Sequence, residues 1–101
     1  MAIMLGVVGA LSAFMHEEFN VNDSRDREHI AIKLIAKIPT LAAYAFRTAS
    51  GLPLVGPNKK YNYVQNFLYM MLANPMDDEF EINPVVVEAI DTIFLLHADH
   101  E

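Results

Sequence analysis

The chain has 101 residues, which is enough for one domain and too few for two. It carries 7 Lys and Arg against 13 Asp and Glu, and this net charge of −6 argues against a general nucleic-acid binder. Hydrophobic residues make up 53 % and charged residues 20 %, which excludes a disordered chain. The absence of cysteine excludes a disulfide framework, a Cys-based zinc site and a cysteine nucleophile, and it fits a cytoplasmic location.

So apolar a composition is unusual for a small domain, which buries only about two-thirds of the surface of its unfolded chain. We therefore expect either a large apolar interface or a piece of a larger protein. The chain ends favour the second, because Met1 enters an apolar helix without a capping residue and Glu101 follows His100 without a helix-stop signal.

The first predicted helix covers residues 2–17. It is no secretory signal, because no Lys or Arg precedes Arg25, and its apolar run is too short to span a membrane. Two glycines in a helix cost about 1 kcal/mol each relative to alanine, which favours tight packing against another helix, such as one of a second subunit. An ordinary core helix is the alternative. The small residues that line one side are Ala2, Gly6, Gly9, Ala10 and Ala13.

A second helix is predicted to begin near Ser24, as its N-cap, and to end near Gly51 as the residue after the C-cap. Its apolar stripe keeps one phase across Pro39, so we expect one long helix with a proline kink rather than two helices. The stripe consists of Ala31, Leu34, Ile35, Ile38, Leu41, Ala42, Ala45 and Phe46.

After a loop over residues 52–61, Asn62 and Gln65 form a capping box that predicts a short third helix ended by Asn74-Pro75. Its expected buried residues are Phe67, Leu68, Met70 and Met71. Asn83, followed by Pro84, caps a fourth helix. No repeat and no strand alternation is found, so the predicted fold class is all-α with four helices.

The candidate site lies at the end of the fourth helix. The expected buried stripe Val86, Ile90 and Ile93 continues into His97 and His100. Buried imidazoles need partners, and the helix dipole favours positive charge at this end, so the pair suits an anionic ligand such as a carboxylate. Structural histidines or a frayed, exposed helix end remain alternatives, and without a third ligand nearby no metal site is expected.

Short motifs along the whole chain resemble citrate synthase. Residues 96–101 read LHADHE, a string similar to one of the family's segments. Residues 37–43, KIPTLAA, resemble its kinked K-x-P-T-x-A-A helix, and residues 63–71 resemble its Y-x-x-N-F-L-x-M-M helix. The N-terminal helix and Asn83-Pro84 before His-x-x-His stand in the matching order.

The resemblance implies that residues 1–101 are a single partial domain, an internal fragment of the bacterial type of the enzyme's large helical domain. That enzyme, of the tricarboxylic acid cycle, condenses acetyl-CoA with oxaloacetate and water to give citrate and CoA. By resemblance His100 matches the oxaloacetate-binding histidine and His97 matches its structural neighbour. No catalytic residue falls within the segment, so the resemblance implies that the isolated segment is inactive. It also implies no cofactor, because acetyl-CoA is a substrate, and no nucleic-acid or membrane partner.

The family assembles as dimers or hexamers, and in the hexameric branch the positions of Lys33 and Lys37 contribute to an inhibitory NADH site. Met15 and Met76 replace a tyrosine and a cysteine associated with that site, and a solvated helix face explains the two lysines equally well. The alternative functions are a 2-methylcitrate synthase fragment and a non-catalytic all-α oligomerisation module.

Overall fold

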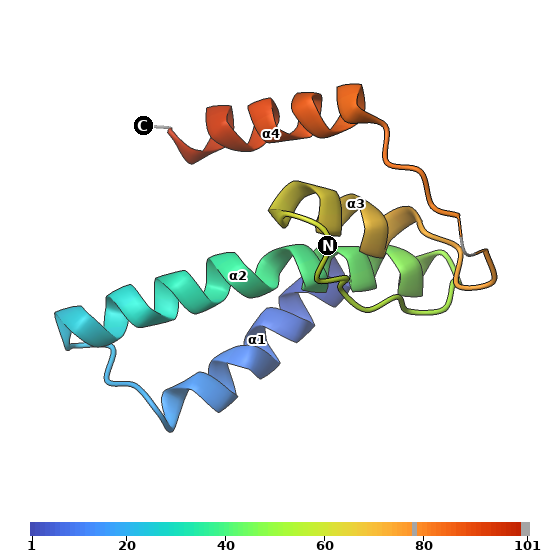
Figure 1. The fold of residues 1–101 in the computed structure, drawn as a ribbon. Helices are drawn as coiled ribbons and strands as arrows, with labels where there is room; N and C mark the ends of the chain where they lie inside the picture. Colours follow the sequence, from blue (N-terminus) through green and yellow to red (C-terminus); the bar gives the residue numbers. More distant parts are fainter. Residues whose placement is uncertain (78, 100–101) are drawn as a thin grey trace.

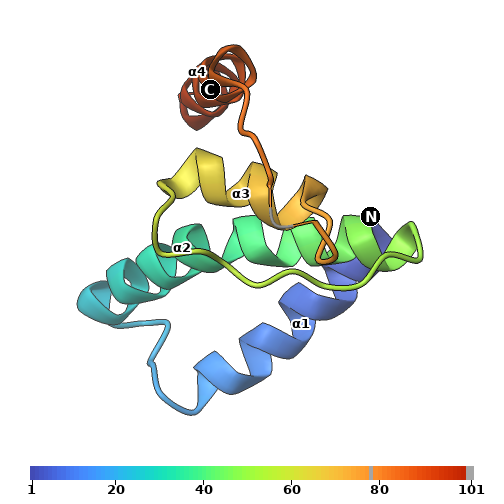
Figure 2. The same cartoon turned by 45° about the vertical axis from the view of Figure 1, so that its right-hand side comes forward.

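The computed structural model describes residues 1–77 and 79–99, and this part of the chain folds into four α-helices without a strand. They are α1 (Ala2–His16), α2 (Ser24–Ala49), α3 (Tyr63–Leu72) and α4 (Pro84–Ala98). The helices are stacked with α3 between α2 and α4, and with α1 on the other side of α2 (Figure 1). Figure 2 shows the same order from a second direction. The all-α prediction is confirmed.

Side-chain caps set the starts of three helices. The cap of α2 is Asp23, whose carboxylate accepts from the backbone N–H of Arg25 at 2.8 Å, so the prediction of Ser24 was wrong by one residue. Asp23 keeps an extended backbone while Ser24 already lies in the helix. At α3, Asn62 and Gln65 form the predicted capping box. At α4, Asn83 accepts from the N–H of Val85, with Pro84 in the first turn as predicted.

The long helix α2 runs without interruption through Pro39, as the unbroken stripe predicted. Its C-cap is Ser50, and Gly51 follows with φ of +68°. Only glycine adopts this left-handed conformation without a steric penalty, so Gly51 ends α2 in the predicted manner. Residues 52–62 then lead to α3 outside any helix.

The core lies between α2 and α3, but on a different face of α2 from the predicted one. The buried residues of α2 are Pro39, Ala43 and Arg47, spaced four apart. They pack under α3, whose buried residues are Val64, Leu68 and Met70. In the predicted stripe, Ile35 is 63 % exposed and Phe46 is 44 % exposed, so that stripe was wrong as the principal buried face. Small side chains at positions 39 and 43 let α3 approach closely.

The helix α4 has no buried residue, and the predicted buried stripe on it was also wrong. Of the predicted stripe, Val86 and Ile93 are exposed and Ile90 is half-buried, and the other half-buried residues are Val87 and Phe94, one position after Val86 and Ile93. Apolar residues occupy nearly all sides of this helix, so their spacing alone does not determine which side meets α3.

The four helices leave much apolar surface uncovered. The accessible surface is 7813 Å², whereas a compact protein of this mass exposes about 5,800 Å². The radius of gyration is 15.3 Å, compared with about 13 Å for a compact domain of this length. Apart from the adjoining turns of α1 itself, no atom of the described part of the chain lies within 4 Å of a Cβ added at Gly6 or Gly9. The expected close neighbour of α1 is therefore not supplied by these residues.

The helix α2 also meets a simple length and hydropathy test for a membrane-spanning helix. The helix has 26 residues, and an 18-residue window within it is apolar enough to cross a membrane by length and composition alone. Helices inside soluble proteins pass the same test, and α2 here packs against both α1 and α3.

Candidate functional site

Side chains of α2, α3 and α4 line an open groove of about 500 Å³, which we call the three-helix groove. Its walls are almost entirely apolar, and His97 is one of the few polar groups at its edge. The groove is lined by Ile35, Ile38, Pro39 and Ala42 of α2, by Tyr63 and Phe67 of α3, and by Phe94, His97 and Ala98 of α4.

An aromatic cluster connects α4 to the rest of the molecule. The Phe94 ring lies 5.8 Å from the Phe67 ring and 6.3 Å from the Tyr63 ring, centroid to centroid. The contact with Tyr63 is edge-to-face, with an angle of 76° between the ring planes. Such aromatic pairs contribute about 0.5–1.5 kcal/mol beyond the area that they bury. These contacts place the second half of α4, including His97, beside the groove.

The orientation of His97 follows from one hydrogen bond. Its Nδ1 lies 2.8 Å from the backbone carbonyl oxygen of Ile93, one turn earlier in α4. A carbonyl can only accept, so Nδ1 carries the proton and donates it. Nε2 is then the nitrogen that accepts a hydrogen bond when the ring is neutral and donates one when the ring is cationic. His97 is exposed and not buried as the stripe predicted, so a ligand can reach this nitrogen.

The second predicted histidine, His100, lies outside the described residues. The structure therefore places one member of the predicted pair at the edge of the groove.

The two lysines lie away from the groove. The Nζ atom of Lys33 is 3.0 Å from a carboxylate oxygen of Glu18 and 4.4 Å from the centroid of the Phe19 ring. A nucleotide phosphate at Lys33 would have to compete with Glu18 for the same charge. Lys37, one turn further along α2, is exposed.

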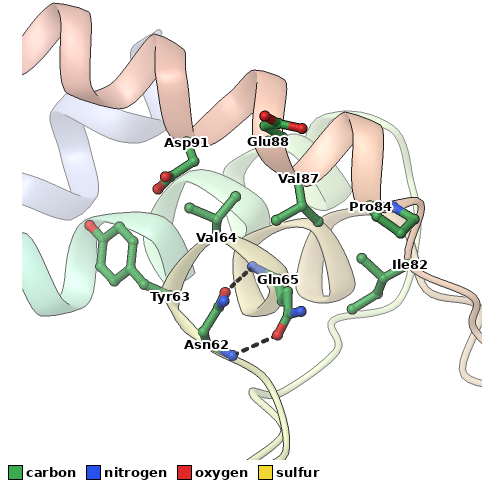
Figure 3. Close-up of a pocket in the computed structure, with 9 residues that line it drawn as sticks. All are labelled: Asn62, Tyr63, Val64, Gln65, Ile82, Pro84, Val87, Glu88 and Asp91. Atoms are coloured by element: carbon green, nitrogen blue, oxygen red, sulfur yellow. Dashed lines mark hydrogen bonds between the residues drawn. The ribbon is translucent and has the colours of Figure 1, made fainter.

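A second cavity, of about 460 Å³, lies between the start of α3 and the first half of α4 (Figure 3). Its polar groups include the Asn62–Gln65 capping pair, whose members bond to each other's backbone, and the carboxylates of Glu88 and Asp91. Two negative charges on one wall disfavour a carboxylate ligand. The histidine edge of the three-helix groove is therefore the better candidate for an anion.

Sequence reasoning missed Arg47, which is 2 % exposed and has no carboxylate partner among the described residues. Its guanidinium donates to the carbonyl of Pro53 and to the carbonyls of Met71 and Ala73, the latter at 3.1 and 2.8 Å. The last two groups belong to the C-terminal end of α3, where the helix dipole attracts a cation. Arg47 therefore fastens α3 and the following chain to α2, and its donors are directed at protein carbonyls.

Tyr63 was predicted only through its place in a motif. Its hydroxyl donates to the carbonyl of Ile35 in α2 at 2.7 Å, and burial raises the pKa of this hydroxyl above its usual value of 10.0. The signal that could have found this contact is Pro39. A proline removes the N–H that the carbonyl four residues earlier would otherwise accept.

Comparison with known proteins identifies the family. The sequence profile of the citrate synthase C-terminal domain matches residues 1–101. The chain belongs to the citrate synthase family. A solved structure of citrate synthase from Pyrobaculum aerophilum is 35 % identical and superposes with a TM-score of 0.64. The match covers 96 % of this chain and 22 % of that chain, so the four helices correspond to part of the helical domain of a citrate synthase.

Proposed function

We propose that this chain is the part of a citrate synthase that contributes His97 and His100 to the oxaloacetate pocket. The complete enzyme would condense acetyl-CoA with oxaloacetate and water to give citrate and CoA. The family match over residues 1–101 supports the reaction. The observation that carries the site is the His97 ring, oriented by the Ile93 carbonyl at the edge of the three-helix groove.

The chemistry of the substrate fits this edge. Oxaloacetate carries two carboxylates and a keto group, all of which accept hydrogen bonds. When Nε2 carries a proton, the His97 ring can donate from it to a carboxylate, and a hydrogen bond to a charged group contributes about 1.5–3 kcal/mol. His97 is also the one basic residue in the last turn of α4, where the helix dipole supports positive charge. The chain as a whole is acidic, so this position is locally distinct.

In this proposal the residues of this chain bind oxaloacetate and orient it. Removing a proton from the methyl group of acetyl-CoA needs a base, and the keto group of oxaloacetate needs a donor that polarises it. We assign both tasks to residues outside this segment. The segment alone should therefore release no CoA thiol from acetyl-CoA and oxaloacetate, and measurable turnover would contradict this assignment.

Substrate binding is tested by an NMR titration of the chain with oxaloacetate, following the His97 imidazole signals. His97→Asn should weaken oxaloacetate binding by about tenfold to a hundredfold, because it removes one hydrogen bond between charged groups. His29→Asn is the matched control, since His29 lies in α2 beside Phe19 and away from the groove. Equal effects of the two substitutions would refute a role for His97.

We also propose that α1 lies in a contact between subunits, as its glycine-bearing face and the excess of accessible surface indicate. Sedimentation of the chain should then show self-association at micromolar concentration. An associating chain without any affinity for oxaloacetate would favour the alternative, a non-catalytic oligomerisation module.

A further inference from the structure

The middle of α2 contains a hydrogen bond that crosses between helices. In an α-helix each carbonyl accepts from the N–H four residues later. Pro39 has no N–H, so the carbonyl of Ile35 loses its partner within α2. The hydroxyl of Tyr63, the first residue of α3, donates to this oxygen at 2.7 Å. A side chain 28 residues away thus takes the place of the missing backbone donor.

The same tyrosine also contacts α4. Its ring meets the Phe94 ring edge-to-face at 6.3 Å, and Phe94 directly follows Ile93, whose carbonyl orients His97. Because α4 has no buried residue, its position depends on a few contacts of this kind. Tyr63 therefore connects the proline site of α2 with the turn of α4 that carries His97.

We propose that Tyr63 is a positioning residue, which replaces the amide that Pro39 lacks and thereby holds Phe94 and His97 in a fixed place beside the groove. Its hydroxyl is engaged by the protein, so it does not touch the substrate. The consequence for oxaloacetate rests on the proposed function of His97, whereas the link between Tyr63, Pro39 and α4 does not.

The simpler explanation is that the Tyr63 ring packs on Phe94 and that the position of its hydroxyl is incidental. A double-mutant cycle separates the two, since Pro39→Ala restores an N–H that can serve the Ile35 carbonyl. Tyr63 is 46 % exposed, so water replaces part of the lost contact, and with Pro39 present Tyr63→Phe should lower the folding equilibrium constant of the chain by about threefold to tenfold, as measured by urea unfolding. In the Pro39→Ala background, the same substitution should change it by less than about twofold.

Tyr61→Phe is the matched control, because the Tyr61 hydroxyl makes no hydrogen bond to the described residues and its ring packs on Tyr69. It should leave the folding constant within about twofold in both backgrounds. Equal losses from Tyr63→Phe in the wild-type and Pro39→Ala backgrounds would overturn the proposed replacement of the amide. A wild-type chain without a cooperative unfolding transition would overturn it as well.

The effect on α4 is read from the imidazole signals of His97 in the folded chain. Tyr63→Phe should shift these signals, Tyr63→Phe with Pro39→Ala should largely restore them, and Tyr61→Phe should leave them unchanged. An unshifted His97 in Tyr63→Phe would refute the positioning role. If His97 shifts as expected while oxaloacetate fails to bind the wild-type chain, the positioning role stands and the proposed function of His97 fails.

Discussion

Replacing Arg47 by methionine should be among the most damaging single changes in this chain. Methionine fills much of the space of the arginine stem, but it has no donor for the carbonyls of Pro53, Met71 and Ala73. Arg47 is 2 % exposed and its contact with Ala73 is buried, so water does not readily reach that oxygen; the contacts with Pro53 and Met71 are part-buried, and water replaces the lost donor there only in part. Each buried acceptor without a partner costs about 1–3 kcal/mol.

Because two of the three contacts are part-buried, the losses lie near the lower end of this range and together amount to about 3–5 kcal/mol, against a total stability of about 5–15 kcal/mol for a domain of ordinary size. At about 1.5 kcal/mol per molar urea, the unfolding midpoint followed by circular dichroism should fall by about 2–3 M. Arg47→Lys should recover only part of this loss, because an ammonium group lacks the planar fork of donors that reaches three carbonyls.

Arg27 provides the matched control. Its guanidinium also donates to two backbone carbonyls, those of Val21 and Asn22 at 3.3 and 3.4 Å, but this contact is exposed. Water replaces the lost donors there, so Arg27→Met should cost less than about 0.5 kcal/mol. Midpoints for Arg47→Met and Arg27→Met within about 0.5 M of each other would refute the argument that burial decides the difference.

Three further predictions follow from local features. Asn62→Ala removes the side-chain acceptor of the α3 capping box and should lower the free energy of unfolding by about 1 kcal/mol in urea titrations. Gly9→Ala should raise the free energy of unfolding by about 0.5–1 kcal/mol, because no described atom outside α1 obstructs the added methyl group. If α1 packs closely on a second copy, the same substitution should weaken self-association in sedimentation. Burial raises the pKa of Tyr63 above 10.0, so its contribution to stability is complete below pH 10 and is lost as the pH rises further. The decline of the urea midpoint as the pH rises past 10 should therefore be shallower in Tyr63→Phe.

Features set by neighbouring residues were predictable from the sequence. The caps at Asn62 and Asn83 and the left-handed Gly51 depend on contacts within a few residues, and the structure confirms all three. The continuity of α2 through Pro39 was also predictable, because the apolar residues keep one phase on both sides of it. The error at Ser24 is of the same local kind, since Asp23 is an equally good capping residue.

Which face of each helix is buried could not be predicted in the same way. Both α2 and α4 carry apolar residues on several sides, so the choice depends on where α3 packs, which is a long-range property. The pattern favoured the large residues Ile35 and Phe46, whereas α3 packs on the small Ala43 and on Pro39. Arg47 was missed for a related reason, because its partners are carbonyls at the ends of other segments and no acidic residue marks them.

The candidate site was accessible to sequence reasoning only in part. The spacing on α4 singled out His97, and the structure places it at the edge of the groove. His100 remains a prediction, as do the nucleotide contacts of Lys33 and Lys37. The roles of Tyr63 and Phe94 required the structure, because they connect residues 28 or more positions apart.

The shallow attachment of α4 gives the molecule two levels of stability. Detaching α4 uncovers little apolar surface, whereas separating α2 from α3 uncovers Leu68 and Met70, which are 4 % and 2 % exposed. Amide protons of α4 should then exchange with solvent through local opening, well before those of α3. On the proposed function, a ligand that contacts both His97 and the α2 and α3 walls of the groove would bind only the attached form, and its binding would be coupled to the attachment of α4.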